Sequence, residues 1–325
     1  MHYIDLHCDT IMALYNSKED LNLKDANLQI NLQKLKKGNC LAQCFAMFVP
    51  LKVENPFETC MAMIDRYYEE IARNADLIAP AYTIEDINNN QSQGKMSAIL
   101  TIEEGGVVKN NLSFLRDFYR LGVRMICLNW NYINGIGHPN FTYIEGKKPD
   151  FKTPNTKDGL TEFGINMVKE MNRLGIIVDV SHLSDAGFYD VLRVSTKPIV
   201  ASHSNARSVC NNVRNLTDEM IIALHNNGGV MGMNYCAAFM NDNEELGKQT
   251  IDNVVAHIKH IKSLVGVDNI ALGSDFDGID PDIELADASL MPMLFDRLKA
   301  EGFTEEELEK IAYKNFLRVL KANLV

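Results

Sequence analysis

Histidines and carboxylates occur in five short segments of the chain, each directly after a run of mainly apolar residues. The segments are His7-Cys8-Asp9, Glu103-Glu104-Gly105-Gly106, Ser181-His182, Ser202-His203 and Asp275-Phe276-Asp277-Gly278. Imidazole nitrogens and carboxylate oxygens are ligands that suit Zn²⁺ and similar divalent cations, and a thiolate is not required. Each segment alone has an ordinary structural explanation, such as a turn or a buried histidine. Their recurrence at the ends of apolar runs favours a metal centre.

Spacing within the segments supports this interpretation. His7 and Asp9 are two residues apart, and because successive side chains of a strand point to opposite faces, we expect both on one face. His182 and His203 provide a second, nitrogen-rich group. A carboxylate between the two groups can bridge two metal ions roughly 3.5–4 Å apart. Asp179 is either a hydrogen-bond partner of a ligand histidine or a structural residue.

The elements that must position these residues are short β-rich runs separated by helical patterns. Eight runs are predicted as strands: residues 3–6, 41–49, 97–102, 124–129, 176–180, 198–202, 230–234 and 270–274. Most are continuously apolar, as expected for parallel strands covered on both faces. Eight such units predict an α/β protein with a (β/α)8 barrel, in which the carboxyl ends of all strands lie on one rim. The alternative is an open, doubly wound sheet, but no GxGxxG motif follows the first strand.

Amphipathic patterns predict the helices between these strands. They cover residues 57–78, 112–121, 160–174, 185–194, 217–226 and 250–265, with a final helix from Thr304 to about residue 320. His225, His257 and His260 fall in these helices and are expected at the surface. The polar segment 131–156 is rich in Gly, Pro and Asn, and we interpret it as a long loop that covers an active site.

Composition limits the class of protein. The 325 residues are 46% hydrophobic and are predicted to form one domain, 1–325. The net charge of −11 and the absence of any apolar run of about 20 residues predict neither nucleic-acid nor membrane binding. Seven cysteines without a CxxC pair, and an N-terminal sequence unlike a signal peptide, predict a reduced, cytoplasmic protein. A homodimer is the expected assembly for a soluble enzyme of this kind.

At these residues the sequence resembles the membrane (renal) dipeptidase family along nearly the whole chain. Residues 5–10 resemble the family's D-x-H-x-D-[TL] motif, and residues 104–106 its E-G-G segment. Residues 159–164 and 179–182 are similar to G-L-[TS]-x-F-G and D-x-[SA]-H. Residues 202–215 resemble a long signature that contains Ser202-His203-Ser204 and Arg214-Asn215, and residues 274–278 resemble [GS]-D-F-D-G.

The resemblance implies a role for each residue. His7, Asp9 and Glu104 would bind one Zn²⁺, and Glu104, His182 and His203 a second, so that Glu104 bridges two ions per chain. Arg214 would bind the carboxylate of the substrate through its planar guanidinium, and Asp275 would carry the proton. Glu104 and Asp275 are therefore the expected catalytic residues.

One position departs from the family. Kidney-type members have L-T-H-N after the fourth strand, and here the run is Leu128-Asn129-Trp130-Asn131. Trp130 replaces a histidine that assists substrate binding, and its side chain can donate only through the indole N–H. We expect Trp130 either to contact substrate or to be a packed wall of the pocket.

The activity implied by the resemblance is zinc-dependent hydrolysis of dipeptides by a metal-bridging hydroxide. The first alternative is a related binuclear-metal amidohydrolase acting on N-acyl amino acids or lactams. The second is a metal-dependent binding protein with little catalysis.

Overall fold

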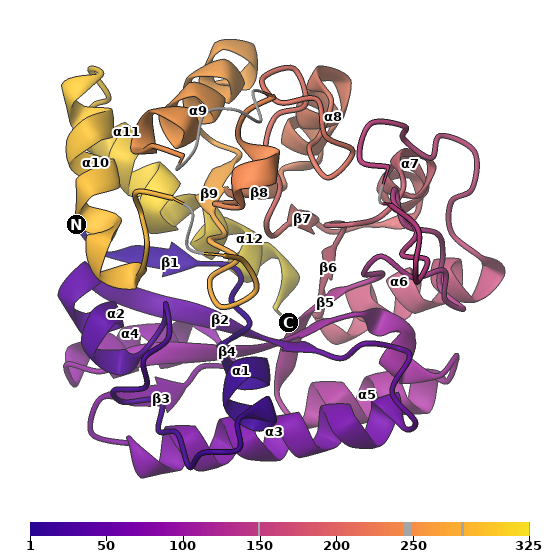
Figure 1. Ribbon diagram of the computed structural model, residues 1–325, viewed down its shortest axis with the longest axis horizontal. Coiled ribbons are helices and arrows are strands. Elements are labelled where there is room, and N and C mark those ends of the chain that lie inside the picture. Colours follow the sequence, from indigo (N-terminus) through magenta and orange to yellow (C-terminus); the bar gives the residue numbers. More distant parts are fainter. Residues whose placement is uncertain (149, 243–248, 281–282, 325) are drawn as a thin grey trace.

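Nine parallel strands form the centre of the computed structural model, which describes residues 1–148, 150–242, 249–280 and 283–324. The strands are β1 Tyr3–Asp5, β2 Cys40–Phe48, β3 Ile78–Pro80, β4 Met96–Glu103, β5 Val123–Cys127, β6 Ile177–Asp179, β7 Val200–Ala201, β8 Val230–Met233 and β9 Ile270–Leu272. Eight of them close into a barrel, because β1 pairs with both β2 and β9, and β2 also pairs with β4 (Figure 1). All eight predicted strands and the (β/α)8 architecture are confirmed.

The ninth strand, β3, was not predicted. Residues 57–78 were expected to be one helix, but α3 spans Pro56–Arg73 and its last turn is closed by Asn74, whose backbone N–H donates to the carbonyl of Ile71. The chain then enters β3, which pairs with Met96–Ala98 at the start of β4. Beyond that point β5 pairs with the rest of β4, so β3 extends the edge of the sheet without entering the barrel.

Helices surround the barrel (Figure 1). They are α1 Thr10–Asn16, α2 Leu32–Gly38, α3 Pro56–Arg73, α4 Ile84–Ser92, α5 Leu112–Arg120, α6 Glu162–Leu174, α7 Asp185–Val194, α8 Asp218–Asn227, α9 Ile251–Val265, α10 Met291–Ala300, α11 Glu305–Glu309 and α12 Asn315–Asn323. Several begin where a hydroxyl accepts a backbone N–H: Thr161 accepts that of Gly164, and Thr304 forms a capping box with Glu307. A π-helical segment, Lys310–Lys314, joins α11 to α12.

Helix α12 closes one end of the barrel. Its residues Phe316, Val319 and Leu320 belong to a buried cluster with side chains from inside the barrel, including those of Ile4 and Ile99. The opposite end, where the strands finish, is the end at which (β/α)8 barrels carry their active sites.

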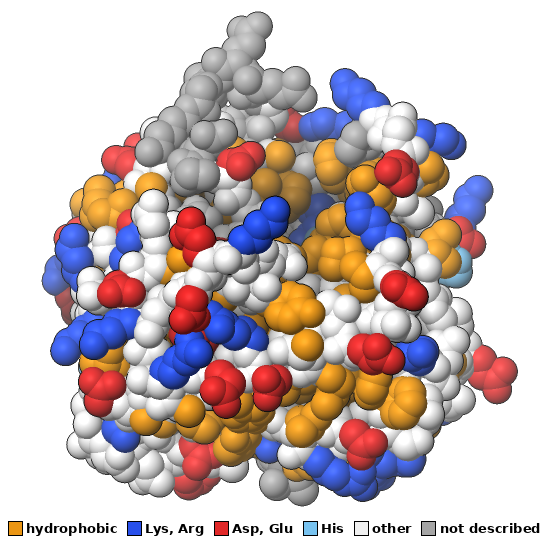
Figure 2. Space-filling view, turned by 60° about the horizontal axis from the view of Figure 1, so that its bottom comes forward, with side chains coloured by type: hydrophobic (Ala, Val, Ile, Leu, Met, Phe, Trp, Pro, Cys, Tyr) orange, Lys and Arg blue, Asp and Glu red, His pale blue; other side chains and the backbone are white. Residues whose placement is uncertain are grey.

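Acidic and basic side chains are interspersed on the face of the molecule that Figure 2 shows, and hydrophobic side chains form separate groups between them. This face therefore has no extended surface of one charge. Within the described ranges, no helix combines the length and the apolar character needed to cross a bilayer.

Candidate metal centre and substrate pocket

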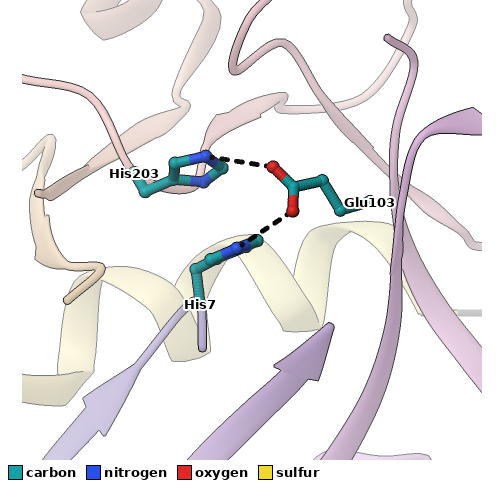
Figure 3. A group of neighbouring side chains, drawn as sticks. All are labelled: His7, Glu103 and His203. Atoms are coloured by element: carbon teal, nitrogen blue, oxygen red, sulfur yellow. Dashed lines mark ion pairs between the residues drawn. The ribbon is translucent and has the colours of Figure 1, made fainter. Parts of the chain in front are cut away.

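Three histidines from different strands meet around one carboxylate at the carboxyl end of the barrel. His7 follows β1, His182 follows β6, His203 follows β7, and the carboxylate is that of Glu103, the last residue of β4. The His7 Nε2 lies 3.4 Å from Glu103 Oε2 (Figure 3), while His182 Nε2 and His203 Nε2 lie 3.0 and 3.5 Å from Oε1. All four side chains are buried. One carboxylate thus contacts both histidine groups, which is the arrangement that a bridging ligand requires.

The prediction that Glu104 is this bridging residue is wrong. Its carboxylate accepts hydrogen bonds from the backbone N–H of Gly106 at 2.8 Å, the backbone N–H of Trp130 at 2.8 Å and the Asn134 side-chain amide at 2.6 Å. With φ of 84°, Glu104 is the residue at which the chain leaves β4 and turns. Burial raises the pKa of its carboxyl to about 7, against the three donors. Glu104 fixes the turn, and its neighbour faces the histidines.

The alternation of β4 explains the difference and was readable from the sequence. Even-numbered residues such as Leu100 and Ile102 pack in the outer core, while Ile99 packs inside the barrel. The polar residues of the run, Ser97, Thr101 and Glu103, are all odd-numbered. Side chains two apart share a face, so Glu103 belongs to the inward set, and the family motif pointed to the adjacent position.

Hydrogen bonds at the Nδ1 atoms fix His182 and His203. Ser202 Oγ donates its single proton to Asp179 Oδ2 at 2.5 Å, so the 2.7 Å contact with His203 must be donated by Nδ1–H. His182 Nδ1 likewise donates to Asn131 Oδ1 at 2.8 Å. Both Nε2 atoms are then unprotonated. Of the two roles considered for Asp179, the structure supports that of a partner, acting through Ser202.

The unprotonated Nε2 atoms of His182 and His203 carry lone pairs that could bind a cation. The Nε2 atoms of His182 and His203 are 3.0 Å apart, and neither carries a proton that could make a hydrogen bond between them. Burial lowers the pKa of both imidazoles well below the ordinary value, with further lowering from Arg214 and His7, so both are neutral. Two lone pairs and a carboxylate oxygen at this separation suit a divalent cation, and the donor set is one that zinc takes.

The side chains of His7, Asp9 and Asp275 form a second group, close enough together to hold a metal ion. The His7 Nε2 lies 3.5 Å from Asp9 Oδ2 and 3.7 Å from Asp275 Oδ1. His7 Nε2 and Asp9 Oδ1 have no hydrogen-bond partner in the described part of the chain. Burial works against charge on His7, but Glu103 and Asp9 raise the pKa of its imidazole well above the ordinary value. The carboxylates therefore favour positive charge at this point.

Burial shifts the acids of the site as well. It raises the pKa of Glu103 to about 7 and that of Asp275 to about 6; His7 opposes both shifts, and Asp9 adds to them. Asp275 is held by a 2.9 Å hydrogen bond from the Asn234 amide. Two buried carboxylates, of Asp9 and Glu103, and the partly exposed carboxylate of Asp275 place negative charge around His7 that a bound cation would offset.

The backbone adopts an uncommon conformation at the ends of several strands. His182, Asp275 and Asp277 have φ of 66°, 65° and 66°, as Glu104 has 84°. Residues other than glycine rarely adopt this left-handed backbone conformation, and those that do cluster at functional sites. Of these residues, His182 and Asp275 line the cavity described below.

A cavity of about 210 Å³ opens over these ligands. Its walls combine Asp9, Glu103, His182 and Asp275 with Arg214 and with the apolar side chains of Met12, Phe48, Trp130, Phe151, Phe239 and Ile279. Arg214 is buried, stacks 5.3 Å from the Phe239 ring centroid, and has an Nε without a hydrogen-bond partner among the described residues. A buried guanidinium with a free N–H in a cavity is suited to an anionic group.

The structure thus brings together His7, Asp9, His182, His203, Arg214, Trp130 and Asp275, as predicted, and replaces Glu104 with Glu103. The long segment 131–156, apart from residue 149, which lies outside the described residues, contributes Asn131 and Phe151 to the cavity. His257 was expected at the surface, and this is wrong. It is fully buried, with Nδ1 accepting the Ala206 N–H and Nε2 contacting the carbonyl of Met240.

Comparisons with known proteins find relatives along the whole chain. The family model for membrane dipeptidases (peptidase family M19) matches residues 1–324. Dipeptidase 3 of Mus musculus is 31% identical over 340 residues, which cover 98% of this chain and 64% of the mouse protein, so the chain spans less than two thirds of that relative. Dipeptidase tcpJ of Claviceps purpurea (strain 20.1) is 31% identical over 92% of this chain and 70% of its own.

One solved structure is similar over the whole fold. A metallo peptidase from Rhodobacter sphaeroides, liganded with a phosphinate mimic of the dipeptide L-Ala-D-Ala, superposes with a TM-score of 0.88 at 26% identity and covers 99% of both chains. Together with the family match, this similarity assigns the enzyme class. The chain belongs to the membrane dipeptidase family of metallopeptidases.

Proposed function

We propose that this enzyme is a zinc-dependent dipeptidase with two ions bound per chain. The observation that carries the proposal is Glu103, whose two oxygens face His7 on one side and His182 and His203 on the other. His7, Asp9 and Glu103 would hold one ion, and Glu103, His182 and His203 the other. Bound there, two divalent cations would supply a Lewis acid for the scissile carbonyl and a shared water of lowered pKa.

Asp275 is the residue that we assign to proton transfer. Its Oδ1 faces the ligand group, 3.7 Å from His7 Nε2, while Oδ2 accepts the hydrogen bond from Asn234. A carboxylate held by one oxygen, with the other facing the reacting bond, can accept a proton and return it to the departing amine.

Arg214 is the residue that we assign to the carboxyl terminus of the substrate. It lines the same cavity as Glu103 and Asp275, and its guanidinium is positioned by a 3.3 Å hydrogen bond to the carbonyl of His203. A cavity of about 210 Å³ has room for a dipeptide rather than a long peptide. The Arg214 guanidinium at one end of the cavity and the limited volume of the cavity together favour free dipeptides.

The second candidate is hydrolysis of N-acyl amino acids or lactams by the same ligands. The apolar wall formed by Phe48 and Trp130 supports it, because such a wall accepts an acyl chain as well as a side chain. Dipeptides carry a free amino group, and Asp275, the carboxylate of the cavity that is not assigned to an ion, provides negative charge for it. This negative charge favours dipeptides over N-acyl amino acids and lactams, which lack the free amino group.

Assay of the zinc-loaded enzyme on dipeptides of varied chirality, including L-Ala-D-Ala, beside their N-acetyl analogues, tests the proposal. We expect dipeptides to be hydrolysed faster, with activity lost on chelation and restored as zinc is added back to two equivalents. Undiminished rates after complete removal of metal, or faster turnover of the N-acetyl compounds, would contradict it.

We also propose that residues 1–325 form one domain and that the enzyme works in the cytoplasm. All seven cysteines are free thiols, and six of them are buried. This is the pattern expected in a reducing compartment.

A further inference from the structure

We propose that Trp130 and Phe48 form the binding surface for the side chain of the substrate's amino-terminal residue, and that dipeptides with a large apolar residue there are preferred. This inference rests on the proposed dipeptidase function and adds a substrate class to it.

The order of strands places this surface opposite Arg214. Phe48 is the last residue of β2, and Trp130 follows the end of β5, so the two flank β4 and its Glu103. Around the closed barrel β2 and β4 stand opposite β7 and β8. Arg214 follows β7, and its stacking partner Phe239 follows β8. The ligand group therefore lies between the guanidinium and the aromatic pair.

A dipeptide bound by its carboxylate must cross the ligand group toward this pair. An extended chain advances about 3.3–3.6 Å per residue. With the carboxylate at Arg214 and the scissile carbonyl at the metal ligands, the amino-terminal residue lies on the far side of Glu103. The side chains that line the cavity on that side include Phe48 and Trp130.

The aromatic pair is packed against other rings and is partly open to the cavity. The Trp130 ring lies 5.0 Å from that of Phe48, 4.9 Å from Tyr132 and 6.1 Å from Tyr143, measured between centroids. Tyr132 and Tyr143 thus support the indole, which is only half-buried. An apolar substrate side chain would cover this surface and remove it from water, which favours binding.

Glu104 holds the backbone of Trp130 in place. Its Oε2 accepts the Trp130 N–H at 2.8 Å, while Oε1 is bound by Gly106 and Asn134. The chain of Trp130 is therefore tied to the turn that ends β4, next to Glu103. The position of the aromatic surface relative to the metal ligands is fixed by adjacent residues.

Kinetics with Leu-Gly, Phe-Gly and Gly-Gly test the proposal. We expect the zinc-loaded enzyme to favour Leu-Gly over Gly-Gly by about tenfold or more in kcat/KM, because each methylene in an apolar pocket contributes appreciably. Trp130→Ala should reduce this ratio by about fivefold or more, mainly through KM for Leu-Gly, and Trp130→Phe should keep most of it. Tyr189→Ala, which removes an exposed aromatic residue on α7, is the matched control and should leave the ratio unchanged.

Fluorescence provides a readout independent of turnover, since Trp130 is the only tryptophan of the chain. In zinc-loaded Asp275→Asn, whose asparagine tolerates the left-handed backbone, Leu-Gly should shift the emission and saturate at a lower concentration than Gly-Gly. Equal ratios in wild type and Trp130→Ala, or emission insensitive to saturating Leu-Gly, overturn the inference. Failure of the wild type to hydrolyse any dipeptide, while Leu-Gly still shifts the emission, overturns the proposed function and leaves this binding surface standing.

Discussion

Glu103 and Glu104 are consecutive, yet their carboxylates belong to different networks: that of Glu103 contacts three histidines, and that of Glu104 accepts hydrogen bonds from two backbone N–H groups and a side-chain amide. The separation arises because β4 ends at Glu103 and the backbone of Glu104 turns with a positive φ. Glu103 is therefore suited to bind cations, and Glu104 is suited to stabilise the backbone turn.

Glutamine at each position separates the two roles. Glu103→Gln should lower zinc content below two per chain and reduce kcat/KM by at least about a hundredfold, since even residues that only orient a ligand are worth 10–100-fold. Glu104→Gln should keep both ions but lower the free energy of unfolding by about 1–3 kcal/mol, because one amide oxygen cannot satisfy three donors. Elemental analysis and urea denaturation measure the two effects; full zinc in Glu103→Gln would restore Glu104 as the candidate ligand.

The contact between Ser202 and His203 predicts an effect on metal affinity. Ser202→Ala removes the group that accepts from His203 Nδ1 and links it to Asp179, so the imidazole is no longer held in its tautomer. We expect zinc affinity to fall about 10–100-fold in competition with a chelator. Ser263→Ala on α9 removes an exposed hydroxyl that bonds only the carbonyl of His260, and it serves as the control. An unchanged affinity would exclude the orienting role.

Arg214 should determine whether the enzyme distinguishes a free carboxylate from an amide at the carboxyl end of the substrate. In Arg214→Ala we expect KM for free dipeptides to rise about a hundredfold, and KM for dipeptide amides to change little, because amides lack the charge that the guanidinium binds. Arg214→Lys should recover part of the affinity but not the bidentate geometry. Equal losses on acids and amides would mean that Arg214 supports the pocket without binding the carboxylate.

His257 predicts a dependence of stability on pH that is separate from the metal centre. Burial lowers the pKa of its imidazole to about 4, below the unfolded value near 6.5. Between these values the unfolded chain binds the proton and the native chain does not, so stability is full above pH 6.5 and is lost as pH falls toward 4. The loss approaches about 3 kcal/mol from this residue.

The variant His257→Gln isolates the contribution of His257 to the pH dependence of stability. Its side chain keeps an acceptor for the Ala206 N–H and a donor for the Met240 carbonyl. In chelator-treated protein, the difference in unfolding free energy between wild type and variant should change by that amount from pH 7 to pH 4. A constant difference across this range would show that the pKa of His257 is the same in the native and unfolded states.

Sequence reasoning recovered the barrel because buried parallel strands are apolar on both faces, and residues that interrupt them stand out at the strand ends. It failed where the decision depended on one residue of register. The choice between Glu103 and Glu104 required the alternation of β4, which a motif ignores. The three residues of β3 are too few for a periodic pattern. His257 looked like a surface residue, because its partners come from the loop after β7 and from the residue after the short helix Ala237–Phe239, which no local pattern reveals.

The packing of α12 has a consequence for the folding of the chain during its synthesis. Phe316, Val319 and Leu320 fill the end of the barrel opposite the ligands, against residues that include Ile4 of the first strand. We therefore expect the barrel interior to stay open to water during synthesis until α12 leaves the ribosome, and the ring of strands to stay incomplete until β9 pairs with β1. The histidines that follow β1, β6 and β7 are therefore brought together late, so a nascent chain halted before α12 should be unable to retain a metal ion at this site.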